Sequence, residues 1–290
     1  MVRTYFVLFF FLTSIIIKAQ TFTFPKNQEV KQRAGYYYNF NNERKVSNWI
    51  GYTLTNEDVV GTEPSLVIFH KDSSESKCAK GTDYGNHSFA LGTLKPRSSA
   101  RNSRLEMKAV HNMLNVVPMN RELCRGSWRI LDNMIAGWAV IFDSLYVVTG
   151  PVFNAQDSRV VGDYKVNVPD KLFKVVLVKN GLDLGAIAFL IPNNETGNTI
   201  NQYSMSVDSL EAITGYDFFS ELPEYLEVFI EEKVNVGMWK DLSVSYKIKS
   251  TRIKEGRCIA AQKSGERCTM STECITLNCW KHGCDLKQKK

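Results

Sequence analysis

Basic residues between Ser88 and Arg104 are the first candidates for chemistry in this chain of 290 residues. The segment SFALGTLKPRSSARNSR contains no acidic residue, and its cationic side chains are those of Lys95, Arg97, Arg101 and Arg104. Such side chains can contact nucleic acid, because phosphate oxygens accept a large share of the hydrogen bonds that nucleic-acid-binding proteins donate. The alternative is an ordinary solvated loop.

Cysteines form the second candidate set, and five of the seven fall within residues 258–290. These five are Cys258, Cys268, Cys274, Cys279 and Cys284. In an oxidising compartment such a cluster indicates a disulfide framework, because a segment this short cannot build a hydrophobic core of its own. A zinc site around His282, in CWKHGC, is the alternative.

The pairing of these cysteines stays open. The four that follow Cys258 can pair in three ways, and the alternating way joins Cys268 to Cys279 and Cys274 to Cys284. Cys258 is then left to bridge to Cys78 or Cys124 in the main body. Because seven is an odd number, at least one thiol is free, pairs between chains or binds another group.

Residues 1–19 have the pattern of a secretory signal peptide. Arg3 makes the start positive, the apolar run YFVLFFFLTSIII follows, and the small Ala19 precedes Gln20. A membrane anchor is the alternative, but the apolar run is shorter than the roughly twenty residues that a spanning helix needs. We therefore expect a secreted protein that begins near Gln20 and has no membrane segment in its mature form.

The formal net charge of +6 is concentrated at the two ends of the chain. Residues 1–19 hold two basic and no acidic residue, and residues 251–290 hold nine basic and four acidic residues. Residues 20–250 are therefore close to neutral. Proteins that bind nucleic acid usually carry their positive charge on the binding domain, so this pattern argues against tight, unspecific binding of polyanions by the body alone.

Strands dominate the expected secondary structure, with helices between them, which predicts an α+β domain. Residues 35–55 and 171–193 predict hairpins, the second joined at Asn180-Gly181. Residues 65–70 and 144–153 predict single strands, the latter stopped by Gly150-Pro151. Helices are expected at 126–143, at 206–219 with Ser206 or Asp208 as N-cap and Gly215 at its end, and at 223–233.

Five of these stretches, taken in order, resemble one protein family. They are NWIGYTLT (Asn48–Thr55), VVTGPVF (Val147–Phe153), VPDKLFKVVL (Val168–Leu177), AIAFLIPN (Ala186–Asn193) and YSMSVDSLEAITGYDFFSELP (Tyr203–Pro223). They resemble the secreted bacterial and the mitochondrial DNA/RNA non-specific endonucleases. The resemblance implies a ββα-metal nuclease fold with a mixed sheet and helices over residues 20–245. A linker at 246–257 and a small disulfide-rich, basic module at 258–290 would follow.

The resemblance also implies an active site. In the family, a D-R-G-H loop supplies a histidine that acts as general base and an arginine that neutralises phosphate charge. A later pattern, N-x-x-P-Q followed by N-x-x-x-W-x-x-x-E, supplies an asparagine that ligates magnesium and a glutamate that holds its waters. Phosphodiester cleavage needs a base of near-neutral pKa, positive charge beside the phosphate and oxygen ligands for a hard cation.

Two anchors place this pattern on the chain. N-x-x-P falls on Asn115–Pro118, and Trp128 stands where the family has its tryptophan. Counted back from Asn115, D-R-G-H falls on Ala90–Thr93, so Leu91 takes the arginine position and Thr93 the position of the base. Threonine cannot act as a base near neutral pH, which makes Thr93 an ordinary strand residue.

The metal positions are substituted as well. Cys124 takes the asparagine position, four residues before Trp128, and Asp132 takes the glutamate position, four residues after it. Cys124 is a soft ligand that suits zinc or copper rather than magnesium, so a disulfide or a buried thiol is its expected role. Asp132 could still hold a water or an ion, and the alternative is a solvated or capping carboxylate.

Histidines elsewhere in the chain could restore the chemistry only by a rearrangement. His87, in DYGNH, precedes Thr93 by six residues, and His111 stands where an apolar residue is usual. His87 also lies in a glycosylation sequon at Asn86, and Asn194 starts a second sequon. We therefore expect Thr93 and Cys124 near Asp132, in a cleft without a histidine.

These features predict a secreted protein with a degenerate nuclease site, which binds nucleic acid or a partner without efficient cleavage and needs no cofactor. Nucleic acid would bind the basic loop and tail, and a protein partner would bind the cysteine-rich tail. One alternative is an active endonuclease with replaced catalytic groups, which would require Mg²⁺ or another divalent cation. Another is a structural or signalling module whose tail carries the function.

Overall fold

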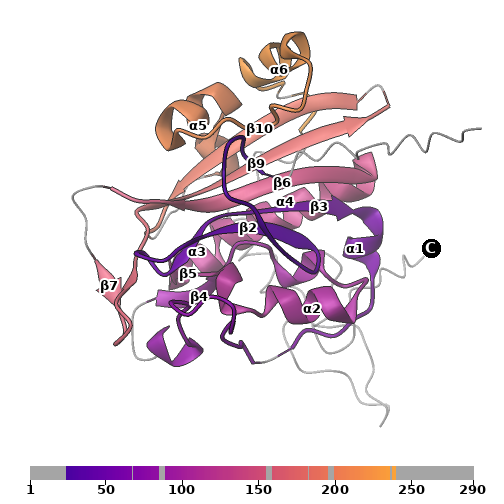
Figure 1. Cartoon of the computed structure of the whole chain (residues 1–290). Coiled ribbons are helices and arrows are strands. Elements are labelled where there is room, and N and C mark those ends of the chain that lie inside the picture. The colour runs from indigo at the N-terminus through magenta and orange to yellow at the C-terminus, as the bar shows by residue number, and fades with distance from the viewer. Residues whose placement is uncertain are drawn as a thin grey trace, which may run out of the picture.

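The computed structural model describes residues 24–239, apart from residues 67, 85–88, 155–158, 182, 195–198 and 236. Its centre is a seven-stranded sheet in which each described pair of neighbouring strands is antiparallel (Figure 1). In spatial order the strands are β1 (Lys31–Arg33), β2 (Tyr36–Asn41), β3 (Val46–Thr55), β6 (Ser144–Val152), β9 (Lys171–Asn180), β10 (Asp183–Pro192) and β11 (Ser204–Met205). The predicted α+β class is confirmed, although the strands run antiparallel rather than in mixed directions.

Two small sheets and six α-helices complete the described part of the chain. The small sheets pair β4 (Phe89–Thr93) with β5 (Val116–Asn120) and β7 (Val160–Val161) with β8 (Val166–Asn167). The helices are α1 (Asn56–Val60), α2 (Arg104–Val110), α3 (Arg121–Arg125), α4 (Ser127–Phe142), α5 (Val207–Thr214) and α6 (Glu224–Glu231). Short 3₁₀ turns lie at Gly81–Tyr84, Arg97–Ser99, Met113–Asn115 and Ile200–Tyr203.

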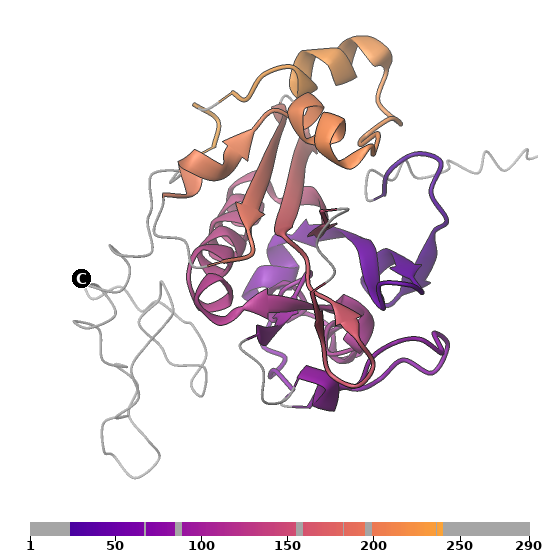
Figure 2. The same cartoon turned by 90° about the vertical axis from the view of Figure 1, so that its left-hand side faces the viewer.

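Helices cover both faces of the large sheet. Helix α4 packs into a core on one face, and α5 and α6 pack into a second core on the other. Figure 2 shows α4 apart from the orange α5 and α6, with the sheet between them.

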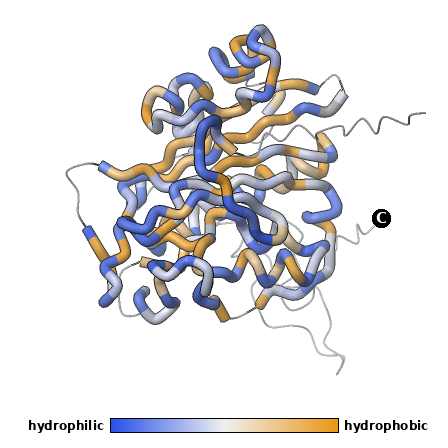
Figure 3. The backbone as a smooth tube through the Cα atoms, viewed as in Figure 1, coloured by the Kyte–Doolittle hydropathy of each residue, from blue (hydrophilic) through white to orange (hydrophobic). Residues whose placement is uncertain are grey.

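Strand β9 shows why the sequence there is almost continuously apolar. Its side chains alternate between the two cores, as the two-residue period of a strand requires. Leu172, Val176 and Val178 join the α4 core, and Phe173, Val175 and Leu177 join the other. Figure 3 shows the resulting concentration of hydrophobic residues along the central strands. The even-numbered Lys174 therefore points, with Leu172 and Val176, toward α4.

Local signals in the sequence set several boundaries correctly. Gly181 follows β9 with a φ of +60°, which glycine adopts without strain, and β10 returns antiparallel from Asp183. Helix α5 begins after Ser206, whose hydroxyl accepts a hydrogen bond from the Ser209 amide, and it ends at Gly215 in the left-handed conformation. Of the two candidate caps, Ser206 is therefore the one used.

Two expected strand features are wrong. In residues 65–70, of which residue 67 is not described, only His70 forms a bridge, and the side chain of Ile68 is 78% exposed. Apart from the His70 bridge, the described residues of this segment do not join a sheet, so their apolar pattern does not form a strand. Strand β6, in turn, does not stop at Gly150-Pro151 but continues to Val152, because its pairing with β9 extends through these residues.

Alanine substitutions at two glycines should change stability in opposite directions. A Cβ at Gly150 would overlap the Asn48 carbonyl oxygen and lie 2.8 Å from a ring carbon of Phe173, so Gly150→Ala should destabilise the fold by about 1–3 kcal/mol. Gly137 in α4 is exposed and has open space around its Cβ position. Gly137→Ala should therefore stabilise by about 0.5–1 kcal/mol through its helix propensity. Urea unfolding measures the free energy of unfolding of both variants. A change of the same sign in both would contradict the packing described at Gly150.

The ends of the chain lie outside the described residues. These ends carry the predicted signal peptide, the linker at 246–257 and the cysteine-rich module at 258–290. Within residues 24–239, as far as they are described, the helices lack the length and apolar character needed to cross a bilayer.

Candidate functional site

Strands β4 and β5 and the helices that follow them bring the aligned positions together. Leu91 lies opposite Pro118 and Thr93 opposite Val116 in this two-stranded ribbon. Helix α3 begins directly after β5, contacts both strands and carries Cys124. Helix α4 follows after one residue. The chain thus has the strand–strand–helix order that the resemblance implies.

Gly92 is retained for a steric reason. A Cβ at this position would overlap the Cβ of Met119 on the neighbouring strand and lie 3.1 Å from its sulfur. The close approach of β4 and β5 therefore requires glycine, whatever chemistry the neighbouring residues perform.

The end of β4 is held by a tryptophan and a buried lysine. The indole Nε1 of Trp128 donates a hydrogen bond to the Thr93 carbonyl over 3.1 Å. The Lys174 ammonium donates one to the Leu94 carbonyl over 2.9 Å and lies 4.3 Å from the centre of the Trp128 ring. The backbone at the position of the family's base is thereby fixed to both α4 and β9.

Asp132 is the ionic partner of this lysine. Its Oδ1 lies 3.1 Å from the Lys174 ammonium, and Lys174 is completely buried while Asp132 is 8% exposed. Burial raises the pKa of Asp132 to about 6, although Lys174 opposes the rise. Burial likewise lowers the pKa of Lys174. Asp132 is therefore neither the solvated nor the capping carboxylate that the sequence suggested as the alternative to ion binding.

Cys124 sits beside this pair, within an arginine cluster. Its thiol is half-buried, and burial together with Asp132 raises its pKa. Arg129, Arg97 and Arg125 act in the opposite direction, so all three lie within electrostatic reach of the thiol. Cys124 and Asp132 thus lie near each other, together with Arg97, whereas the Thr93 carbonyl is bonded to Trp128. Arg125 and Arg129 were missed by sequence reasoning, although each directly follows a residue singled out in the pattern.

Lys95 does not belong to a basic surface, and the predicted phosphate contact there is wrong. The side chain is completely buried, and its ammonium donates hydrogen bonds to the Gly35 carbonyl over 2.7 Å and to Glu106 over 3.0 Å. Arg101 is half-buried, and its backbone amide donates a hydrogen bond to the carbonyl of Asp58 in α1. Arg104 is exposed in the first position of α2. Of the four predicted cations, Arg97 is the one described as near Cys124.

The described histidines supply no general base at these positions. His111 is completely buried, with Nδ1 2.7 Å from the Met107 carbonyl and its ring packed against Phe69. His70 forms the backbone bridge to Asn112. His87 and the sequon residue Asn86 lie outside the described residues, while Asn194 is exposed. His111 is thus structural, as the sequence suggested.

Cys78 and Cys124 both carry free thiols in the structure. Cys78 is completely buried, and burial raises its pKa to about 11, so it is an unreactive core residue. The tail cysteines, from Cys258 to Cys284, lie outside the described residues, so their pairing stays a prediction.

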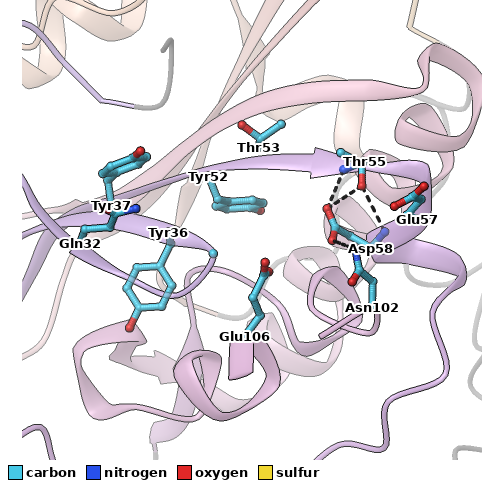
Figure 4. Close-up of a pocket in the computed structure, with 11 residues that line it drawn as sticks. Gln32, Tyr36, Tyr37, Tyr52, Thr53, Thr55, Glu57, Asp58, Asn102 and Glu106 are labelled. Carbon is cyan, nitrogen blue, oxygen red and sulfur yellow. Dashed lines mark hydrogen bonds between the residues drawn. The ribbon is translucent and has the colours of Figure 1, made fainter. Parts of the chain in front are cut away.

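A hollow of about 370 Å³ lies between β2, β3 and α2 (Figure 4). Two of its three carboxylates are already engaged. Asp58 accepts hydrogen bonds from Thr55 and Asn102, and Glu106 accepts one from Lys95. The hollow is not lined by any of the aligned catalytic positions, so it is not the candidate site.

Comparison with known proteins decides the family. The sequence profile of the DNA/RNA non-specific endonucleases matches residues 15–225. The chain belongs to this family. The matched residues include β4, β5, α3 and α4, which hold the positions that the resemblance assigns to the nuclease site.

Similar proteins are bacterial and mitochondrial nucleases. The nuclease of Nostoc sp. is 27% identical over 213 residues, which cover 69% of this chain and 76% of that protein. The nuclease of Serratia marcescens is 24% identical over 220 residues, which cover 70% of this chain and 80% of that protein. The mitochondrial nuclease EXOG of Mus musculus is 22% identical over 222 residues, which cover 70% of this chain but only 60% of EXOG.

A solved structure shows the same fold. It is the crystal structure of the EndoG/EndoGI complex, which superposes with a TM-score of 0.64 at 20% sequence identity. The match covers 69% of this chain and 89% of that one.

The family typically uses Mg²⁺, but the donor atoms present here do not fit it. Magnesium is a hard cation that prefers oxygen ligands. The position that the resemblance gives to the direct ligand holds the Cys124 thiol, a soft ligand whose raised pKa keeps it protonated. The charge of Asp132 is already balanced by the buried Lys174 ammonium.

Proposed function

We propose that this chain binds nucleic acid through a family nuclease site that no longer cleaves efficiently. The single observation that carries the proposal is the replacement of the general base by Thr93. A positioned base contributes roughly a hundred- to ten-thousand-fold to the rate, and threonine cannot replace it near neutral pH.

The arginine cluster supports retained binding. Arg97 and Arg125 are exposed. Together with Arg129, they are close enough to the Cys124 thiol for their charges to lower its pKa. Guanidinium groups bind phosphate oxygens through paired hydrogen bonds, and such contacts do not require a metal ion. Nucleic acid is also the ligand that membership of the family implies.

The second candidate is an active, metal-dependent endonuclease with replaced groups. Family membership and the nuclease activity named for the relatives favour it. The same three arginines would stabilise charge on a phosphate during cleavage. Secretion, predicted from residues 1–19, and a partner for the cysteine-rich tail remain parts of the proposal.

Cleavage and binding by the purified protein distinguish the two candidates. We expect supercoiled plasmid to stay intact with millimolar Mg²⁺ or Mn²⁺, while a fluorescent oligonucleotide binds with an affinity that falls as salt rises. The double variant Arg97→Ala/Arg125→Ala should weaken binding. It should also reduce the steepness of the slope of log K against the logarithm of the salt concentration by about one for each lost phosphate contact.

Lys233→Ala provides the matched control, because this side chain is exposed at the end of α6 and far along the chain from the arginine cluster. It should leave both the affinity and the salt dependence almost unchanged. Plasmid cleavage that a chelator abolishes would support the second candidate. If Lys233→Ala lost as much affinity for the oligonucleotide as the double arginine variant, the arginine cluster would not be the binding surface.

A further inference from the structure

Three carboxylates from α5 and α6 converge outside the nuclease site. They belong to Asp208, Glu211 and Glu231, and one oxygen from each lies within 4.8 Å of the others. Asp208 and Glu211 are three residues apart on α5, which places them on the same side of the helix. Glu231 is the last residue of α6. The group therefore joins two helices that pack side by side on β10 (Figure 1).

Glu231 is buried without a partner that would balance its charge. The residue is 4% exposed, and its Oε1 is buried with no hydrogen-bond partner in the described residues. Buried polar groups in folded proteins are almost always paired, and a buried carboxylate is especially costly when it is not. A buried carboxyl group that has an oxygen without a partner and converges with two further carboxylates indicates a missing cation.

The surroundings add more negative charge. The charges that act on Glu231 come from Glu211, Glu227, Asp208 and Asp217, and all of them are acidic. Burial and this repulsion raise the pKa of Glu231 to about 9 and that of Glu211 to about 7. The nearby Lys26 is partly exposed and forms an ion pair with Asp217 over 3.2 Å. The buried end of the cluster has no such counterion in the described residues.

We propose that Asp208, Glu211 and Glu231 bind a divalent cation, of which calcium fits best. Calcium takes six to eight oxygen ligands at about 2.3–2.6 Å, so oxygens on opposite sides of the ion lie roughly 4.6–5.2 Å apart. The oxygens of the cluster lie within 4.8 Å of one another, which is no farther apart than this geometry allows. Calcium also tolerates irregular geometry and completes its shell with water, whereas magnesium demands near-ideal octahedral geometry with metal–oxygen distances of about 2.1 Å.

Such an ion would clamp α5 to α6 over the second core. Leu210 of α5 and Ile230 of α6 are both buried in that core, next to the acidic residues Glu211 and Glu231. The nuclease site lies across the sheet, on the face covered by α4 (Figure 2). The ion would therefore stabilise the fold without entering the chemistry of the nuclease site.

Thermal unfolding of the full chain tests the site. After treatment with a chelator, calcium at about a hundred times its dissociation constant should raise Tm by roughly 5–10 °C. Magnesium should raise it less. Glu231→Gln should abolish the calcium response, yet its Tm in chelator should equal or exceed that of the wild type, because a neutral amide of the same shape replaces a buried carboxyl group that acidic residues surround.

Two further variants make the test decisive. Glu232→Gln is the matched control, because its side chain is 60% exposed and adjacent in sequence, and it should keep the full calcium response. Asp208→Asn changes an exposed member of the site, so it should fold and weaken calcium binding measured by titration calorimetry. The proposal is overturned if millimolar calcium leaves the wild-type Tm unchanged, or if Glu231→Gln keeps the full response. Proton sharing among the carboxylates would then remain as their explanation.

Discussion

The double variant Thr93→His/Cys124→Asn should cleave plasmid DNA at least about a hundred times faster than the wild-type chain with millimolar Mg²⁺. Histidine would restore a base of near-neutral pKa, which contributes roughly a hundred- to ten-thousand-fold. Asparagine would restore an oxygen ligand for a hard cation in α3. The two gains act on one reaction step and should not be multiplied. The rate of conversion of supercoiled to nicked plasmid measures the effect.

The control for this gain is Thr93→Gln/Cys124→Asn, which restores the ligand but supplies no base. Its cleavage should remain near the wild-type level. If instead the wild type already cleaves as fast as the histidine-containing variant, the site is not degenerate. The Leu91 position still lacks arginine in both variants, so neither is expected to reach the rate of an intact family member.

Lys174→Met should destabilise the fold by about 3–5 kcal/mol at pH 8. The substitution leaves the Asp132 carboxylate buried without its ionic partner, and the loss of one member of a buried pair has costs of this size. It also removes the hydrogen bond to the Leu94 carbonyl. Urea unfolding measures the change, and Lys171→Met, at the exposed start of the same strand, should change stability by less than about 0.5 kcal/mol.

The deficit of Lys174→Met should shrink as the pH falls. The pKa of Asp132 is about 6 in the folded chain and about 4 when unfolded, so the folded state binds the proton more tightly. The tighter binding of this proton stabilises the folded state fully below about pH 4, and its contribution is lost as the pH rises through about 6. Removing Lys174 takes away the charge that lowers the pKa of Asp132, so the protonated Asp132 stabilises the folded variant up to a higher pH.

At pH 5 the variant should therefore lie closer to the wild type than at pH 8. A double variant, Lys174→Met/Asp132→Leu, should recover most of the lost stability, since an apolar pair needs no counterion. A deficit that is the same at both pH values would show that the lost hydrogen bond, rather than the unpaired carboxylate, dominates.

The elements of the fold were largely predictable because their signals are local. The hairpin at Asn180-Gly181 needs a glycine with positive φ, and the Ser206 cap and the Gly215 end of α5 depend on hydrogen bonds within one helical turn. The expected strand at residues 65–70 failed for the opposite reason. Its apolar residues resemble a strand, but whether a strand forms depends on a neighbouring sheet that no local pattern reveals.

The sequence by itself determined the family and predicts which motif positions are substituted, since the spacing of a motif can be counted even where individual residues have changed. Thr93 and Cys124 could be identified in this way without any structure. The environment of these positions was decided by tertiary structure alone. Lys174 bonds to a carbonyl 80 residues earlier in the chain, Lys95 is buried against Gly35, and Glu231 meets the carboxylates of α5. Burial and the distance between charges decide whether a lysine faces phosphate or balances a carboxylate, and both exist only once distant segments have packed together.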